Sequence, residues 1–211
     1  MTLQSIWHVF LENIRQLSWQ EWVSTGAQIL SVWYARKNNV LVYPTGMIGV
    51  LLAAYLYYFI SNPPLYADAT LNLYYFFMSA YGWIQWNKRN EQALQYPISW
   101  CTPNERWVGL LLGLIFWAGI AWMLQFTDSN TVLLDALVSA TAIVAMWWMA
   151  KRKTDHWIAW IASNLVAIPL NWYKSYYLFT LMYGLFLFMA LAGLFSWKKI
   201  MAGQSVNSTN P

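Results

Sequence analysis

The sequence is poor in charged residues and has a single cysteine. Only 9% of its 211 residues are Asp, Glu, Lys or Arg, whereas soluble domains carry about a quarter. So few charges cannot cover the surface of a soluble globule of this length, and a water-soluble fold is excluded. Cys101 has no second cysteine with which to form an internal disulfide, so the cysteine content leaves the redox compartment open.

Several classes of enzyme and receptor are excluded by motifs that the sequence lacks. No Gly-x4-Gly-Lys-Ser/Thr loop is present with which to bind and hydrolyse ATP. The two histidines, His8 and His156, are far apart, and no His-Glu-x-x-His or cysteine-rich spacing could hold a metal ion. The last apolar run carries lysine only at its end, so no mid-membrane lysine is available to hold retinal. We therefore expect no catalytic residue, no metal site and no cofactor.

Hydrophobic residues make up 59% of the chain and gather in runs long enough to cross a membrane. A bilayer core of about 30 Å takes roughly 20 residues of apolar helix, and strong breakers such as Arg36-Lys37 separate the runs. The sequence therefore predicts an all-α integral membrane protein with seven transmembrane helices in contact with lipid. A short amphipathic helix on the membrane surface precedes them. The runs are 22–35, 41–60, 69–86, 107–126, 132–150, 157–173 and 176–197.

Most basic residues fall on one side of this seven-span arrangement. Only Arg15 and Lys174 fall on the other side, and short cytoplasmic loops are the ones that collect Lys and Arg. We therefore expect the N-terminus outside and the C-terminus in the cytoplasm. The same bias explains the formal net charge of +4, so no nucleic-acid partner is expected. The residues on the cytoplasmic side are Arg36, Lys37, Lys88, Arg89, Arg106, Lys151, Arg152, Lys153, Lys198 and Lys199.

The two halves of the chain share a pattern. Gly-x3-Trp-x-Lys closes the third apolar run at 82–88 and the seventh at 193–199. Upstream, Ala35-Arg36-Lys37 resembles Ala150-Lys151-Arg152, so runs one to three repeat as runs five to seven with the same orientation. The alternative is a seven-helix bundle without internal symmetry. The repeat divides the chain into an amphipathic segment 1–19, a triple-helix unit 20–89, a linker with the fourth helix 90–127, a second triple-helix unit 128–200 and a polar tail 201–211.

Polar side chains inside a bilayer are costly unless they pair or face a cavity, so they are the first candidates for a binding site. If they converge, they form a pocket of amides, hydroxyls and aromatic planes for a neutral or weakly cationic polar ring. The alternative is that the tryptophans belong to interfacial belts and the small polar residues join helices. The candidates are Asn72, Ser79, Trp83 and Trp86 in the third run, Asp135 and Ser139 in the fifth, Asn164 and Asn171 on a stripe with Trp157 and Trp160 in the sixth, and Thr180 and Tyr183 in the seventh.

The segment 74–86 ends in Gly-Trp-x-x-Trp and resembles the signature of the PnuC nicotinamide riboside transporters. In the second half, Asp135, Ser139, the basic stretch 151–153 with Trp157 after it, Asn164 and the stretch 173–177 match that family in order and spacing. The resemblance covers about residues 20–200.

This resemblance implies facilitated diffusion of nicotinamide riboside across a bacterial inner membrane by alternating access. It also implies a SWEET-like arrangement of three, one and three helices, assembly as a homotrimer, and trapping of the substrate by a cytoplasmic riboside kinase. The family motifs carry over to Trp83, Trp86, Asp135, Ser139 and Asn164, while the other candidates rest on helix-face reasoning. A transporter of another vitamin, such as thiamine or riboflavin, and a seven-helix receptor or sensor are the alternatives.

Overall fold

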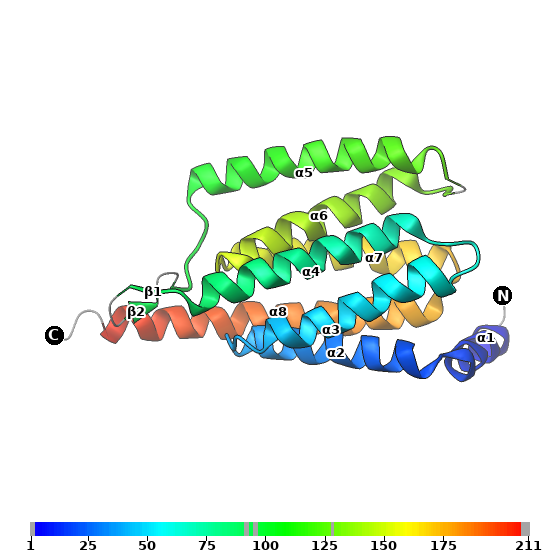
Figure 1. Cartoon of the computed structure of the whole chain (residues 1–211), viewed down its shortest axis with the longest axis horizontal. Helices are drawn as coiled ribbons and strands as arrows, with labels where there is room; N and C mark the ends of the chain where they lie inside the picture. The colour runs from blue at the N-terminus through cyan, green and yellow to red at the C-terminus, as the bar shows by residue number, and fades with distance from the viewer. Residues whose placement is uncertain (1–2, 91–92, 95–96, 128, 208–211) are drawn as a thin grey trace.

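The computed structural model describes residues 3–90, 93–94, 97–127 and 129–207, which are almost wholly helical (Figure 1). The antiparallel strands β1 and β2 begin at Arg89, the last residue of the predicted first unit, and otherwise lie in the predicted linker. Within the described residues, the expected all-α fold holds apart from these four residues. The elements are α1 Leu3–Gln16, α2 Trp19–Arg36, α3 Val42–Tyr55 with the π-helical turn η1 Leu56–Ile60, α4 Tyr66–Asn87, β1 Arg89–Asn90, β2 Ala93–Leu94, α5 Pro103–Leu124, α6 Val132–Ala150, α7 Asp155–Tyr173 and α8 Tyr177–Asn207. Helix α8 therefore extends well into the segment 201–211 that was predicted as a polar tail.

Local sequence explains where two of the long helices begin. Ser18 caps α2 by accepting a hydrogen bond from the Glu21 N–H, and the Glu21 carboxylate accepts one from the Ser18 N–H at 2.6 Å. Thr102 and Glu105 form the same reciprocal box at the start of α5, where a proline takes the first helical position. Such boxes satisfy N–H groups that have no partner within the helix.

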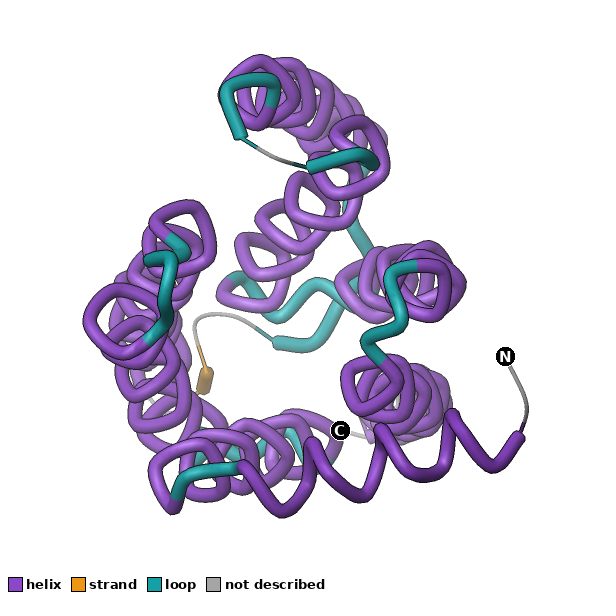
Figure 2. The backbone as a smooth tube through the Cα atoms, turned by 90° about the vertical axis from the view of Figure 1, so that its right-hand side faces the viewer, coloured by secondary structure: helices purple, strands orange, loops and turns teal. Residues whose placement is uncertain are grey.

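The helices pack as two units of three. In the first unit α2 packs against α3 and α3 against α4, and in the second unit α6 packs against α7 and α7 against α8. The units meet along two seams, α2 against α8 and α4 against α6. Figure 2, which looks along the helices, shows α5 outside this arrangement, where it packs on α6.

The start of α5 is fastened to the connection between α6 and α7. The Asp155 carboxylate accepts a hydrogen bond from the Cys101 backbone N–H at 2.8 Å and pairs with the Arg106 guanidinium at 2.7 Å. Lys153 pairs with Glu105 at 2.9 Å. These contacts attach α5 to the second unit through its first turn as well as through its packing on α6.

The apolar helices of this multi-pass membrane protein carry large hydrophobic side chains on their outer faces. Within the described residues, four helical stretches are long and apolar enough to cross a bilayer: Val42–Ile60, Pro103–Leu124, Val132–Ala150 and Tyr177–Gly203. Helices α2, α4 and α7 cover the other three predicted runs but hold more polar residues, and they do not meet that criterion.

The connections between the first two helices of each unit have the same backbone. Asn38 and Arg152 both adopt the left-handed conformation, with φ of 50° and 54°. The Asn38 N–H bonds to the Ala35 carbonyl and the Arg152 N–H to the Met149 carbonyl, both at 2.9 Å. The next N–H, of Asn39 and of Lys153, reaches back five residues in each case. Position 35 is therefore equivalent to position 149, one residue from the match of Ala35 with Ala150 that the sequence indicated.

Candidate functional site

Two of the predicted polar side chains are buried in the interior, one in each unit. Ser79 on α4 is 2% exposed and Asn164 on α7 is 3% exposed. Within the part of the chain that the structure describes, the Asn164 side-chain amide has no hydrogen-bond partner. The amide is not among the fully enclosed polar atoms that lack a partner, so it keeps a small accessible surface. A polar ligand or a water could therefore bond to the Asn164 amide.

An aromatic pair links the helices that carry these two residues. The rings of Tyr75 on α4 and Trp160 on α7 have centroids 6.4 Å apart, with 57° between their planes. Tyr75 precedes Ser79 by one helical turn, and Trp160 precedes Asn164 by one turn, so each helix presents an aromatic and a polar group on one face. We call these four residues the central cluster. Its ring faces, hydroxyl and amide can stack on a planar ring and bond its polar substituents.

The sequence identified three of the four members. Ser79 and Asn164 were candidate site residues, and Trp160 lay on the predicted stripe of α7. Tyr75 was missed, because it is one of four consecutive aromatic residues, 74–77, and does not stand out among them. Its spacing of four residues from Ser79 is the signal that could have selected it.

Asp135 makes an ion pair at the end of the molecule away from most basic loops. The Lys174 ammonium lies 2.7 Å from both carboxylate oxygens. The hydroxyls of Ser129 and Thr131 donate to the same carboxylate at 2.7 and 3.0 Å. Both charged side chains are partly buried. In this conformation Asp135 joins the start of α6 to the end of α7.

Three further candidates use their side chains within their own helices. The Asn72 amide donates to the Asp68 carbonyl at 2.9 Å, the Asn171 amide to the Ala167 carbonyl at 2.8 Å, and the Thr180 hydroxyl to the Tyr176 carbonyl at 3.1 Å. Each partner lies four residues earlier in the chain, which is the usual local bond of such side chains. One amide N–H of each asparagine and the hydroxyl of Thr180 are therefore occupied locally.

Ser139 and Tyr183 also belong to the predicted set, and both lie half-buried. Ser139 follows Asp135 by one turn of α6. Tyr183 on α8 lies within electrostatic range of Asp68, at the start of α4, and of Asp135. Asp135 and Tyr183 therefore lie toward the same end of the molecule.

The two tryptophans of Gly-Trp-x-x-Trp have different surroundings. Trp83 is 42% exposed and lines an open hollow with Ile84, Asn87 and Lys88. Trp86 is 1% exposed, and its indole N–H donates to the Met149 carbonyl at 3.1 Å. The motif therefore supplies one outward ring and one ring packed at a seam between the two units.

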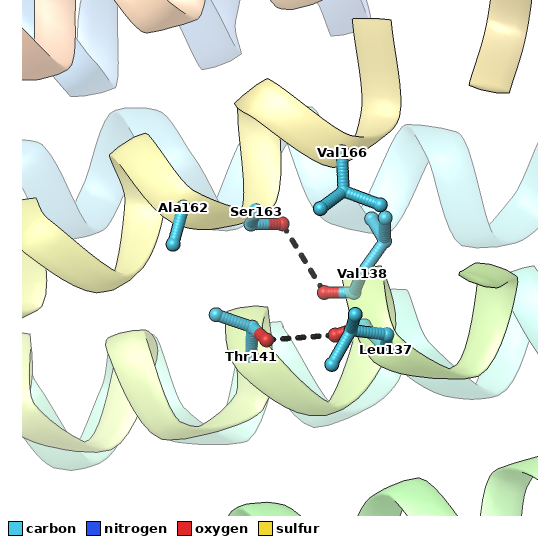
Figure 3. Close-up of a pocket in the computed structure, with 6 residues that line it drawn as sticks. All are labelled: Leu137, Val138, Thr141, Ala162, Ser163 and Val166. Atoms are coloured by element: carbon cyan, nitrogen blue, oxygen red, sulfur yellow. Dashed lines mark hydrogen bonds between the residues drawn. The ribbon is translucent and has the colours of Figure 1, made fainter. Parts of the chain in front are cut away.

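A small cavity lies between α6 and α7 (Figure 3). Its volume is about 100 Å³, well below the roughly 300–1,000 Å³ of ordinary ligand pockets. Both of its hydroxyls bond to backbone: Ser163 to the Val138 carbonyl at 3.2 Å and Thr141 to the Leu137 carbonyl at 2.7 Å. This cavity has little free polar capacity, so the central cluster is the better candidate for a ligand site.

Comparison with known proteins places most of the chain in one group. The model of the family described as nicotinamide mononucleotide transporter matches residues 18–199. The nicotinamide riboside transporter PnuC of Escherichia coli (strain K12) is 25% identical over 207 residues, which cover 86% of this chain and 85% of the relative. The PnuC of Neisseria mucosa is 27% identical over 201 residues, 89% of this chain and 75% of the relative.

Two further similarities concern another vitamin and the fold. The riboflavin/roseoflavin transporter RibM of Streptomyces davaonensis is 27% identical over 124 residues, 57% of this chain and 58% of the relative. Among solved structures, a crystal structure of the vitamin B3 transporter PnuC matches with a TM-score of 0.68 and 24% identity. That match covers 93% of this chain and 87% of the other, and it shows a common fold.

Proposed function

The chain belongs to the nicotinamide mononucleotide transporter family, whose model covers residues 18–199, and we propose that it imports nicotinamide riboside by facilitated diffusion. Membership makes the protein a membrane transporter and not an enzyme. It also decides against the receptor or sensor that the seven predicted helices left open. The relatives named as nicotinamide riboside transporters support the choice of substrate.

The proposed mechanism is alternating access between two equivalent units of three helices, joined by α5. The matching turns at Asn38 and Arg152 support the equivalence of the units. The two seams also support the equivalence of the units. If α2 corresponds to α6 and α4 to α8, the contact of α2 with α8 corresponds to the contact of α6 with α4. Rocking of one repeat against the other around a central site is the usual motion of repeat-built carriers.

We propose seven transmembrane helices, α2 to α8, in a bacterial inner membrane, with the N-terminus outside. The cytoplasmic face would then be the end that carries the connections after α2, α4 and α6, which we call the basic end. Arg36, Lys37, Lys88 and Lys151 belong to it. The bias of Lys and Arg toward cytoplasmic loops supports this orientation.

The central cluster is the proposed substrate site, and the unpartnered Asn164 amide is the observation that carries it. An amide can bond the carboxamide of the riboside, and Tyr75 and Trp160 offer faces for its pyridinium ring. The other sequence candidates stay proposals as contacts in other states of the cycle: Asn72, Trp83, Trp86, Asp135, Ser139, Asn171, Thr180 and Tyr183.

Two proposals about partners rest on the family resemblance. We propose a homotrimer, which the apolar outer face of α5 supports because Trp107, Leu111, Ile115 and Trp122 are exposed on it. We also propose that a cytoplasmic kinase traps the imported riboside as an anion. Because phosphorylation after entry would drive net uptake, the carrier itself would need no ATP site.

Thermal unfolding of the detergent-purified protein with nicotinamide riboside, nicotinamide mononucleotide, thiamine or riboflavin tests the proposal. A ligand that binds only the folded state adds about 2.7 kcal/mol at a hundredfold excess over its Kd. We expect stabilisation by the riboside and none by the mononucleotide. At the same ligand concentration the stabilisation should fall to about half in Asn164→Ala, for a tenfold weaker affinity, and persist in full in Gln125→Ala, which removes an exposed amide beyond α5.

Riboflavin is the second candidate, because RibM is among the relatives. Stabilisation by riboflavin or thiamine alone would replace the substrate and keep the transport mechanism. Silence with all four ligands would refute both the riboside and the two vitamins as substrates.

A further inference from the structure

Buried aromatic side chains gather at the basic end of the protein. Tyr43, Trp86, Trp157, Trp197 and His156 are all fully buried there, and we call them the basic-end cluster. The rings of Trp86 and Trp197, from different units, have centroids 5.9 Å apart. The His156 ring lies 4.7 Å from Trp197. Along α4 and α7, Trp86 and Trp157 lie between the central cluster and the basic end.

Two indole N–H groups in this cluster bond across the seams between the units. Trp86 on α4 donates to the carbonyl of Met149, at the end of α6, at 3.1 Å. Trp197 on α8 donates to the carbonyl of Ala35, at the end of α2, at 2.8 Å. Positions 35 and 149 are equivalent in the two units, so exchanging the units exchanges the two bonds. Both acceptors belong to the last turn of a helix, where carbonyls lack the usual N–H partner four residues later. Each accepts instead the N–H three residues later in the turn, and the indole bond is additional.

We propose that these two bonds form a paired latch that holds the basic end shut and that both break whenever this end opens. The inference rests on the proposed alternating access, in which the two units part at each end in turn. The latch bonds cross the two seams along which the units meet. They are therefore among the contacts that parting of the units must break.

Glycines at equivalent positions of α4 and α8 leave room for the aromatic rings that pack against the two latch tryptophans. A Cβ on Gly82 would lie 2.4 Å from the Tyr43 ring, and one on Gly193 would lie 2.5 Å from the Trp157 ring. These close approaches let Tyr43 meet Trp86 edge to face at 5.1 Å. Trp157 meets Trp197 in the same way at 5.9 Å. Each indole is thus held by an aromatic side chain of its own unit while it bonds to the other unit.

The basic-end cluster also contains buried polar atoms without a hydrogen-bond partner, and their free-energy cost favours opening. His156 Nε2 and Trp157 Nε1 are buried without a hydrogen-bond partner in the described residues. A buried polar atom of this kind costs about 1–3 kcal/mol, which hydration would recover. The latch bonds favour the closed state of the basic end, and the unsatisfied groups favour the open state. Such a balance keeps two conformations close in free energy.

A cysteine placed behind the latch can report its opening. Ala190 on α8 is buried and lies seven residues, about two helical turns, inward from Trp197. We would introduce Ala190→Cys in a Cys101→Ala background and measure labelling by a water-soluble maleimide from the basic end, in membrane vesicles of known orientation. The reporter needs no substrate, so its result is separate from ligand binding.

Trp86→Phe and Trp197→Phe each remove one indole N–H and keep an aromatic ring. One net hydrogen bond contributes about 0.5–1.5 kcal/mol, so each variant should raise the labelling rate about two- to tenfold. In the double variant the two factors should multiply, because both bonds favour the same closed state. Either single variant tests the latch if the other does not fold.

Trp117→Phe is the matched control. Its indole N–H also donates to a backbone carbonyl, of Leu133 at 3.0 Å, but that bond joins α5 to α6 and crosses neither seam. Its labelling rate should equal that of the parent. Unchanged labelling in both latch variants, or an equal rise in Trp117→Phe, would overturn the latch. Absence of riboside binding by the parent protein would instead remove the proposed substrate.

Discussion

Lys174 and Asp135 form an ion pair in which the ammonium lies 2.7 Å from both carboxylate oxygens. The pair joins the start of α6 to the end of α7. Both side chains keep about a fifth to a quarter of their surface exposed, so we expect the pair to contribute about 1 kcal/mol after solvent screening. Lys174→Ala and Asp135→Ala should each lower the thermal stability. The double variant should lose less than the sum of the two single losses, and strictly additive losses would show that the ions are not coupled.

Asn164→Ala should weaken riboside binding about tenfold and leave the folded protein about as stable as the parent. The amide has no partner in the described residues, so its removal costs no internal hydrogen bond. Titration calorimetry with the riboside gives the affinity, and thermal unfolding without ligand gives the stability. Trp83→Ala should reduce the affinity less, because that ring is turned outward. The reverse order of effects would move the site away from the central cluster.

Gly82→Ala and Gly193→Ala should each destabilise the protein by about 1–3 kcal/mol, because overpacking forces rings or backbone to shift. The added methyl would lie 2.4 and 2.5 Å from the Tyr43 and Trp157 rings. Gly119→Ala is the control, since nothing lies within 4 Å of its Cβ. That control should raise stability by about 0.5–1 kcal/mol through helix propensity. If all three variants behaved alike in thermal unfolding, the close packing at the two glycines would be refuted.

The Cys101 thiol should stay unreactive at neutral pH. Burial, followed by the charges of Asp155 and Glu105, raises the pKa of this thiol to about 12. Because the unfolded thiol has a pKa of about 8.5, folding favours the protonated form, and this contribution to stability is complete below about pH 8.5 and is lost as the pH rises toward 12. Maleimide should label the thiol only after unfolding in detergent. Rapid labelling of the folded parent at pH 8 would contradict this assignment.

Sequence reasoning predicted the helical membrane fold, the transporter family and the absence of an enzymatic function, and the family match confirms these. Those features depend on apolar runs and on a motif, and both can be read directly from the sequence. The register of the repeat was one residue wrong in its first half: the turns pair Ala35 with Met149 and not with Ala150. By residue type, Ala35-Arg36-Lys37 resembles Ala150-Lys151-Arg152 more closely than it resembles 149–151, so only the backbone hydrogen bonds reveal the register.

The candidate site was harder to predict, because periodicity shows which residues share a face but not where that face points. Trp83 and Trp86 are only one turn apart, yet one is largely exposed and the other is buried at a seam. Asn72 and Asn171 each donate one amide N–H within their own helix, which no composition reveals. Tyr75 joins the site through a ring on another helix, and that contact exists only in three dimensions.

The attachment of α5 to the second unit determines where the chain crosses from one unit to the other. With Cys101 and Arg106 held by Asp155, the covalent tether between the units is the segment from the end of α4 to about residue 98. Its eleven residues, 88–98, could reach about 36 Å when fully stretched. This segment includes the paired strands β1 and β2, so separating them would lengthen it. In the proposed rocking of the two units, the amplitude would then depend on side chains across the seams, which a single substitution can change, and not on the length of the polypeptide.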